Sequence, residues 1–554
     1  MPSIDTVTIA YAICIVSLPV GLTVINLLAR TSGLRRRLAY QAEKQLVYRL
    51  LVHRHSLFGP WNAISLLRPA ILISINVFCL TFHQPPLLAR SGLLTLFNLL
   101  PLFIGPYLEF VADVLGLSFS TFVSWHRWQG RMTCAMLIVH ALSAVADQKP
   151  VSLDSTKGIF IYIVGSLSVL ASAYCFIPFL RRRIYEICLR LHQALAALVV
   201  VGVWLHLLTM PNWPWLWIYV FLLVIALLLL VQVCLTTYRN KKLGRTLSRA
   251  YIRHVTGTIL ISVKLSRPVS VEAGQYVTLW IPRVGLLQTH PFVVSSWTES
   301  PQEILELFIK RRRGLTSSLL RYSEERPTPH VALVSGPHGV SVPVWDYEAV
   351  FMVATDYGIA AQAPYLRKLV HGYNNCKGRT RQIHLIWQVS SLGIVHAAES
   401  FLNPILDDDT LDQGNILDIS IYYDMQQGGM TIEDLEAVAP VCLGDASLAE
   451  KPMMYTMAAP TVEKLLAKYY SAAAEGSQAM ERPTRVKNFG DRARLFIGSP
   501  DLSESLYKAS RMLSDTVSES STREGDMLLL GRQKDFLPRS LYTNLYSSFR
   551  FRQC

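Results

Sequence analysis

A chain of 554 residues is too long for a single compact domain, and its length predicts two or three. Hydrophobic residues make up 51% of it and are concentrated in about the first 236 positions, so we expect a membrane-embedded part followed by a soluble α/β part. The net charge of +14 comes partly from basic loops beside the hydrophobic segments and requires no nucleic-acid partner, and nine cysteines without a CxxC pair argue against a disulfide scaffold or a zinc site.

Hydropathy predicts about seven membrane-spanning helices, near residues 7–28, 64–82, 91–112, 119–144, 157–180, 184–208 and 212–236. The first segment lacks a basic n-region and a small-residue cleavage site, so we expect a retained anchor. Lys and Arg gather after the first, fifth and seventh segments, whereas the opposite loops carry few. The positive-inside rule therefore predicts an outside N-terminus and a cytosolic C-terminal half.

Four histidines within these segments form two pairs with the same spacing. His126 and His140 are 14 residues apart, as are His192 and His206. On a helix this spacing gives about 21 Å of rise and ends about 40° short of four full turns, so each helix presents two imidazoles on nearly one face. Both helices start at the cytosolic side, which pairs His126 with His192 and His140 with His206.

A lone histidine in a spanning helix is more often a polar contact between helices than a metal ligand, but the repeated spacing favours ligation. Two imidazoles on each iron give a six-coordinate haem without an open position, which suits electron transfer. We therefore predict two haems b, one above the other in the bilayer.

After residue 245 the hydrophobic pattern changes to the alternation of strands, as in 256–265 and 275–281. Short motifs follow in order: AGQYV at 273–277, HPFVVSS at 290–296, KRRRGLT at 310–316 and GPHG at 336–339. The stretch FMVATDYGIAAQAPYL at 351–366 predicts a buried strand, a turn and a helix, where a dinucleotide's phosphates approach the backbone. Further strands at 382–389 and 416–423 alternate with helical stretches, as in a parallel sheet.

In this order, behind four paired histidines, these motifs resemble the ferric reductase and NADPH oxidase superfamily of flavocytochromes b. HRWQGR at 126–131 and GIAAQAPYLRKL at 358–369 are most similar to fungal ferric-chelate reductases.

The resemblance implies a multidomain fold with three parts. An all-α transmembrane helix bundle that binds two haems would occupy residues 1–240, with its core at 91–236. An antiparallel β-barrel FAD domain would follow at 245–340, and a ferredoxin-reductase-like α/β NADPH domain at 345–554, with an insertion near 431–488.

The resemblance also implies site residues. The haem-iron ligands would be the four paired histidines. In the flavin site His290 would lie by the FAD diphosphate, with Pro291 and Phe292 at the isoalloxazine ring. The implied FAD residues are Gln275, Tyr276, His290, Pro291, Phe292, Ser296, Gly314 and Thr316, and the implied NADPH residues are Gly336, Pro337, Gly339, Thr355, Gly358, Ile359 and Ala360. No catalytic acid or base is expected, because the cofactors carry the redox chemistry.

The chain departs from the family's pattern at three points. Asp356 and Tyr357 stand in a turn that usually holds two or three glycines, so only Gly358 remains there. Their side chains hinder close approach of a phosphate to the backbone, and Asp356 adds a negative charge. Val293 replaces a hydroxyl residue expected to bond the flavin ring, and the late Cys-Gly motif is missing. These changes affect the predicted electron supply and leave the histidines untouched.

The leading functional prediction is a transmembrane, NADPH-dependent ferric-chelate reductase of iron uptake in the plasma membrane. Electrons would pass from cytosolic NADPH through FAD and two haems to Fe(III), chelated or siderophore-bound, on the far side of the lipid bilayer. A separate iron permease would take up the Fe(II). The alternatives are a superoxide-generating NADPH oxidase and a haem-membrane paralogue with a decayed NADPH site. These residues do not distinguish iron from copper as the metal that is reduced, and they do not distinguish the plasma membrane from the vacuole as the location.

Overall fold

The computed structural model describes residues 50–52, 61–82, 86–147, 184–208, 215–285, 288–312, 314–325, 329–411, 416–423, 484–489, 493–497, 500, 527–531 and 550–553. The predicted spanning segments at 7–28 and 157–180 and most of the predicted insertion lie outside these residues. The chain divides into two compact units, Met1–Cys234 and Leu235–Cys554, each of which is described by itself.

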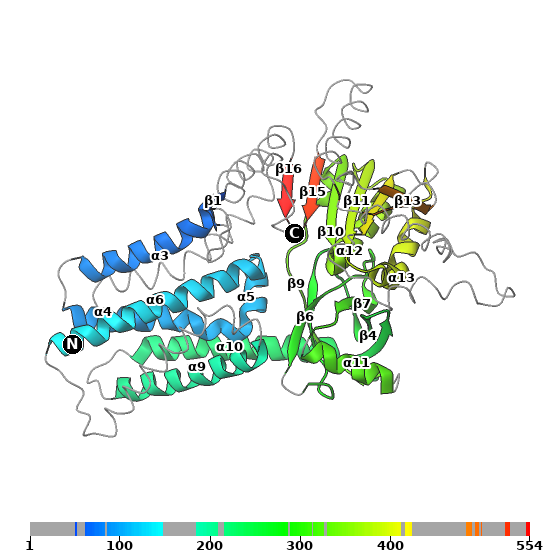
Figure 1. Cartoon of the computed structure of the whole chain (residues 1–554). Coiled ribbons are helices and arrows are strands. Elements are labelled where there is room, and N and C mark those ends of the chain that lie inside the picture. Colours follow the sequence, from blue (N-terminus) through cyan, green and yellow to red (C-terminus); the bar gives the residue numbers. More distant parts are fainter. Residues whose placement is uncertain are drawn as a thin grey trace, which may run out of the picture. The chain divides into compact units, whose positions relative to one another are not determined.

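The first unit is helical (Figure 1). Its described elements are a short hairpin of β1 (Leu50–Val52) and β2 (Trp61–Asn62), then α3 (Ala63–Thr81), α4 (Leu87–Leu99), η2 (Leu100–Tyr107), α5 (Leu108–Val114), α6 (Phe119–Ala146), α9 (Tyr185–Leu208) and α10 (Trp215–Asn240), the last of which continues into the second unit. Four of the described helical stretches are long and apolar enough to cross a membrane: Ala63–Thr81, Leu87–Gly105, Ile187–Leu208 and Leu222–Asn240. The chain is therefore an integral membrane protein.

The helix predicted over 91–112 is not continuous. It runs as α4 to Leu99, tightens into the 3-10 helix η2 and resumes as α5. Pro101 and Pro106 lie in η2, and proline lacks the N–H that an α-helix needs and clashes with the preceding turn. A hydropathy window averages over this interruption, because the prolines stand among apolar residues.

The second unit begins with two antiparallel sheets. One has the order β7-β4-β3-β8, from β3 (Arg249–Val255), β4 (Thr258–Val269), β7 (Gln302–Lys310) and β8 (His330–Val331). The other has the order β6-β5-β9, from β5 (Tyr276–Trp280), β6 (Thr289–Val293) and β9 (Leu333–His338). A single bridge between Val294 and Leu307 joins the end of β6 to β7. Helix α11 (Leu315–Glu325) follows β7, and alternate residues such as Ile259, Ile261 and Leu279 form the core.

A seven-stranded sheet forms the remainder of this unit, in the order β13-β14-β12-β11-β10-β15-β16. Its strands are β10 (Ala349–Thr355), β11 (Gln382–Val389), β12 (Leu417–Tyr423), β13 (Thr484–Phe489), β14 (Ala493–Ile497), β15 (Met527–Gly531) and β16 (Arg550–Gln553). All neighbours are parallel except β13 and β14. Helices α12 (Ile359–Asn374) and α13 (Leu392–Asp408) are the crossovers that parallel strands require, and the 3-10 turns η3 (Val344–Asp346) and η4 (Asp356–Gly358) flank β10.

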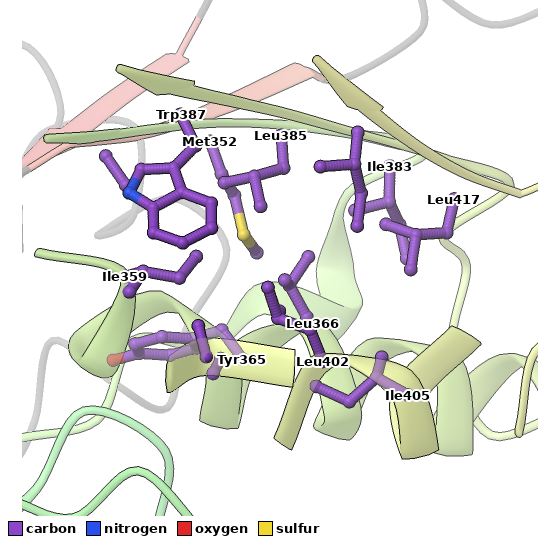
Figure 2. Packing of buried hydrophobic residues seen from close by; sticks show 14 of the residues in the cluster. Met352, Ile359, Tyr365, Leu366, Ile383, Leu385, Trp387, Leu402, Ile405 and Leu417 are labelled. Atoms are coloured by element: carbon purple, nitrogen blue, oxygen red, sulfur yellow. The ribbon is translucent and has the colours of Figure 1, made fainter. Parts of the chain in front are cut away.

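Figure 2 shows how this sheet is covered. Met352, Leu385 and Trp387 point from the sheet toward the helices and are fully buried. Residues from α12 and α13 meet them, with Tyr365, Leu366 and Leu402 labelled in the same view. Strands buried on both faces in this way read as nearly continuous apolar runs, which is why FMVA and ILDISIYY predict strands of a parallel sheet.

Candidate functional site

The structure brings the four predicted histidines together as the two expected pairs. The ring centroids of His126 on α6 and His192 on α9 are 6.4 Å apart, and the ring planes cross at 78°. The rings of His140 and His206 on the same two helices are 6.3 Å apart and cross at 71°. Two parallel helices with equal histidine spacings thus hold two similar pairs at two levels.

These separations fit one metal ion between each pair of rings. With a metal–nitrogen bond of about 2.0–2.1 Å and about 1.1 Å from a ring nitrogen to the ring centroid, two imidazoles that bind one ion would have centroids at most about 6.2–6.4 Å apart. The Nδ1 atoms of His126 and His192 are buried and have no hydrogen-bond partner among the described residues. Buried polar atoms of this kind are rare, and a bound group is one way in which they gain a partner.

One ring nitrogen of His140 is hydrogen-bonded to helix α4. Its Nδ1 lies 3.0 Å from the carbonyl oxygen of Leu88 and 3.4 Å from the hydroxyl of Ser91, both on α4. A carbonyl can only accept, so Nδ1 carries the proton and donates to Leu88. Nε2 is then left with the lone pair that a metal ion needs, and the hydrogen bond fixes the orientation of the ring.

Two glycines that the sequence reasoning missed make room for these rings. A Cβ built on Gly92 of α4 would lie 2.9 Å from Cε1 of His140, and one built on Gly105 of η2 would lie 3.3 Å from Cε1 of His126. Each ring therefore packs directly on the backbone of the α4–η2 segment. Small residues at the contacts of membrane helices are the signal that could have indicated these positions.

Two predicted flavin motifs, AGQYV and HPF, and the predicted nucleotide motif GPHG lie on or beside the sheet β6-β5-β9. Tyr276 of β5 pairs with Val293 of β6 and with His338 of β9. The rings of His290 and Phe292, two residues apart on β6, lie on one side with centroids 6.3 Å apart. The side chains of His290 and Phe292 are half-buried, and that of Pro291 is exposed. The motifs AGQYV, HPF and GPHG thus occupy one small sheet.

The GPHG turn needs its glycines. Gly336 and Gly339 have φ values of +108° and +98°, which residues with a Cβ rarely adopt. A Cβ on Gly336 would also lie 3.2 Å from the carbonyl oxygen of Tyr276. Gln275 donates from Nε2 to the carbonyl oxygen of Gly339 over 3.0 Å, and Pro337 lies between the two glycines after a cis peptide bond. The turn is therefore attached to the strand that carries Tyr276.

Two predicted flavin residues use their hydroxyls within the chain. Thr316 Oγ1 accepts from the backbone N–H of Arg312 and donates to its carbonyl oxygen, both at 2.8 Å, and so closes the turn around Gly314 (φ +87°) before α11. Ser296 Oγ donates to Gln302 Oε1 at 2.8 Å. Any contact of these two residues with FAD phosphates would therefore come from backbone N–H groups.

The predicted nucleotide turn is filled by side chains. Thr355 ends β10, Gly358 precedes α12, and Ile359 and Ala360 are buried in the first turn of α12. Asp356 adopts φ +43°, the left-handed conformation that glycine takes easily. Its carboxylate accepts hydrogen bonds from the backbone N–H and the hydroxyl of Ser390, both at 2.8 Å. The negative charge expected beside a phosphate is thus engaged with the loop after β11.

Tyr357 fills the same turn from the other side. Its hydroxyl lies 3.0 Å from Oγ1 of Thr258, and its ring packs 5.3 Å from that of Phe308. Burial raises the pKa of the Tyr357 hydroxyl above its ordinary value, so the group stays protonated. Gly358 is thus the one glycine of this turn, and Asp356 and Tyr357 place side chains where a glycine-rich turn has none, so the turn does not fit NADPH in the manner that a glycine-rich turn does.

Comparison with known proteins gives two family matches. Residues 91–203 match the family described as ferric reductase like transmembrane component, and residues 248–353 match an FAD-binding domain family. The first match contains three of the four paired histidines and ends before His206. The second match contains all three motifs of the sheet β6-β5-β9.

The chain is also similar to curated relatives of modest identity. It is 27% identical over 266 residues to ferric/cupric reductase transmembrane component 1 of Candida albicans, covering 45% of this chain and 33% of that protein. It is 24% identical over 329 residues to ferric reductase transmembrane component 3 of Saccharomyces cerevisiae, covering 56% and 43%. NADPH oxidase 1 of mouse is 26% identical over 175 residues, covering 31% and 29%. The match thus spans less than half the length of these relatives.

Among solved structures, a flavohemoglobin from Malassezia yamatoensis aligns at 13% identity with a TM-score of 0.33, over 85% of this chain and 98% of its own. A ferredoxin NADP+ reductase from Neisseria gonorrhoeae aligns at 11% identity with a TM-score of 0.27, over 55% and 97%. Both TM-scores are low, so neither likeness bears on fold or function.

Proposed function

We propose that this chain, an integral membrane protein that joins a ferric-reductase-like transmembrane domain to an FAD-binding domain, is a transmembrane ferric-chelate reductase. It would take electrons from NADPH in the cytosol and deliver them to Fe(III), chelated or siderophore-bound, on the far side of the plasma membrane. Iron uptake through a separate permease would follow. The C-terminal half would face the cytosol, as the basic loops predict.

The observation that carries the proposal is the geometry of the two histidine pairs. Ring separations of 6.4 and 6.3 Å at two levels of one helix pair would let each pair of imidazoles hold one haem iron. Both pairs belong to helices α6 and α9, so any motion of one helix against the other alters both together.

Bound NADPH, FAD and haem supply the hydride and electron transfer, and the protein supplies position. His126 and His192 would hold one haem iron, and His140 and His206 the other. The hydrogen bond that His140 donates to the carbonyl oxygen of Leu88 keeps the His140 ring in one tautomer. His290 and Phe292 would bind FAD on the sheet β6-β5-β9, where Gly339 lets the turn lie against Tyr276.

A superoxide-generating oxidase is the second candidate, supported by the similarity to mouse NADPH oxidase 1. A haem-binding protein without NADPH turnover is the third, supported by the filled turn at Asp356 and Tyr357. The three proposals share the haem sites and differ in the electron acceptor or the electron donor.

The test uses the full chain in membrane vesicles. Dithionite should produce a bis-histidine haem spectrum, and NADPH should produce the same spectrum and reduce an added ferric chelate. Superoxide without Fe(II) would favour the oxidase. A dithionite signal that NADPH cannot reproduce would favour the haem-binding protein, and absence of any haem signal would overturn the proposal.

A further inference from the structure

Three buried amide side chains join helices α3, α4 and α6 within the first unit. Asn76, Asn98 and Gln129 are each at most 2% exposed. Asn98 donates from Nδ2 to Oδ1 of Asn76 over 2.7 Å, and Gln129 donates from Nε2 to Oδ1 of Asn98 over 2.6 Å. We call these three residues the amide chain.

The amide chain is anchored to the helices that carry it. Asn98 also donates to the carbonyl oxygen of Leu94 over 2.7 Å, and Asn76 donates to that of Leu72 over 2.9 Å. Gln129 reaches the carbonyl oxygen of Asn98 as well, at 3.2 Å. Each amide is thus held in one rotamer, and the three helices can form these bonds in only one relative position.

The position of the amide chain connects it to the haem ligands. Asn98 lies between Gly92 and Gly105 along the α4–η2 segment, and Gln129 lies between His126 and His140 along α6. The bond between Asn98 and Gln129 therefore stands between the two contacts in which a histidine ring packs on a glycine. A slide of one helical turn, about 5.4 Å, would break that bond and bring both rings against residues with side chains.

The apolar contacts around the amide chain do not define this position as sharply. Leu94, Phe97, Met132 and Met136 pack between the same helices. Methionine is flexible and adapts to irregular gaps, so these contacts tolerate small shifts. Buried amides are different, because one well-placed asparagine can select a single register between packed helices.

We propose that the amide chain sets the axial register of α6 against α4 and thereby positions both His126 and His140. Asn98 and Gln129 are then positioning residues for two haem sites that they do not touch. Asn76 extends this control to α3, which precedes the stretch matched by the ferric reductase family. The inference rests on the proposed haem sites of the proposed function.

The test compares two variants of the full chain purified in detergent. Asn98→Leu removes the bonds of the Asn98 side chain to Asn76 and Gln129 and leaves the buried Oδ1 of Asn76 without the donor that Asn98 supplied. The triple variant Asn76→Leu, Asn98→Leu and Gln129→Leu leaves no buried amide unpaired and so should fold, because replacing all partners by apolar groups is often nearly neutral. Thr95→Val is the matched control, since the Thr95 hydroxyl donates only to Ser91 of its own helix at 2.7 Å in the described structure.

Two readouts report on the histidines. Transfer of haem to an excess of apomyoglobin measures how tightly haem is held, and the low-spin EPR signal depends on the angle between the two imidazole planes, here 78° and 71°. We expect the triple variant to insert and melt like the wild type, to hold haem roughly 10- to 100-fold less tightly, as for other residues that orient metal ligands, and to show a shifted EPR signal.

A triple variant with wild-type haem transfer and EPR signal would overturn the inference and leave the proposed function standing, because the amide chain would then contribute only to stability. A wild-type chain without a bis-imidazole signal would overturn the proposed function and the inference with it. Thr95→Val should match the wild type in both readouts, and an equal effect there would also contradict a role specific to the amide chain.

Discussion

Replacement of Gly92 by alanine should selectively disturb the His140–His206 pair. The new Cβ would lie 2.9 Å from Cε1 of His140, which is about 0.5 Å inside ordinary van der Waals contact. His140 cannot easily yield, because its Nδ1 is bonded to Leu88 on the same helix as Gly92. A metal site tolerates about 0.2 Å of error in its bond lengths, so a shift of this size is too large for it.

The magnitude follows from the cost of inserting a methyl group into a packed contact, about 1–3 kcal/mol. If that cost falls on the haem-bound state, the affinity of the His140–His206 pair for haem should drop roughly 5- to 150-fold. At Gly105 the new Cβ would lie 3.3 Å from His126, where a movement of a tenth of an ångström or so relieves the contact. Gly105→Ala is therefore the matched comparison, and it should leave the haem affinity nearly unchanged.

The assay is the haem-to-protein ratio of purified full-length chains, measured as the pyridine haemochrome, with apomyoglobin as haem acceptor. We expect two haems per chain for the wild type and for Gly105→Ala, and one for Gly92→Ala after exposure to the acceptor. If Gly92→Ala keeps both haems at the wild-type transfer rate, or if Gly105→Ala is the more damaged of the two, the packing argument is refuted.

Three further predictions concern other parts of the chain. His126→Ala should remove one haem and abolish reduction of ferric chelate by NADPH, while dithionite still reduces the other haem. Asp356→Ala should destabilise the second unit by about 1.5–3 kcal/mol in thermal or denaturant unfolding, because the carboxylate bonds to Ser390 are lost, and Asp356→Gly should cost about 1 kcal/mol less at φ +43°. The pKa of Glu299 is lowered by its hydrogen bonds from Lys377 and then His371, so the contribution of the Glu299 carboxylate, including its ion pair with Lys377, is present above the ordinary carboxyl pKa and is lost as the pH falls through the lowered pKa. The hydrogen-exchange protection factors of amides around His371, which are corrected for the intrinsic slowing of exchange in acid, should therefore fall in acid in the wild type and less so in Glu299→Gln.

Each of these has a result that would contradict it. His126→Ala with two haems would mean that this residue is not an iron ligand. Equal stability of Asp356→Ala and the wild type would mean that the Ser390 bonds contribute nothing net. Protection factors around His371 that are already low in Glu299→Gln at neutral pH and fall less in acid are expected, whereas an identical acid response in both proteins would remove Glu299 as its cause.

The pairing of the histidines could be predicted because helix geometry is local and regular. Spacings of 14 residues in two parallel helices are enough to say which ring meets which, and the structure places His126 by His192 and His140 by His206. Strands around FMVA and QIHLIWQV could be predicted for a similar reason, since their apolar runs have the length of buried strands.

Other features depend on a partner far away in the sequence. The contact of Gly92 with His140 joins residues 48 positions apart, and the carboxylate of Asp356 is bonded to a residue 34 positions further on. The expectation that Asp356 projects its charge toward a phosphate considered only its neighbours in the chain. The structure turns that carboxylate to Ser390, because two hydrogen-bond donors converge there.

The sequence by itself determined the membrane character of the first part, the levels of the four histidines and the order of the flavin and nucleotide motifs. These follow from composition and from the fixed rise of helices and strands. Only the tertiary structure decided which backbone lies against each imidazole, which amides meet between α3, α4 and α6, and what fills the turn after β10. Such contacts arise where separate elements pack, and the free energy of packing depends on the shapes of both surfaces at once.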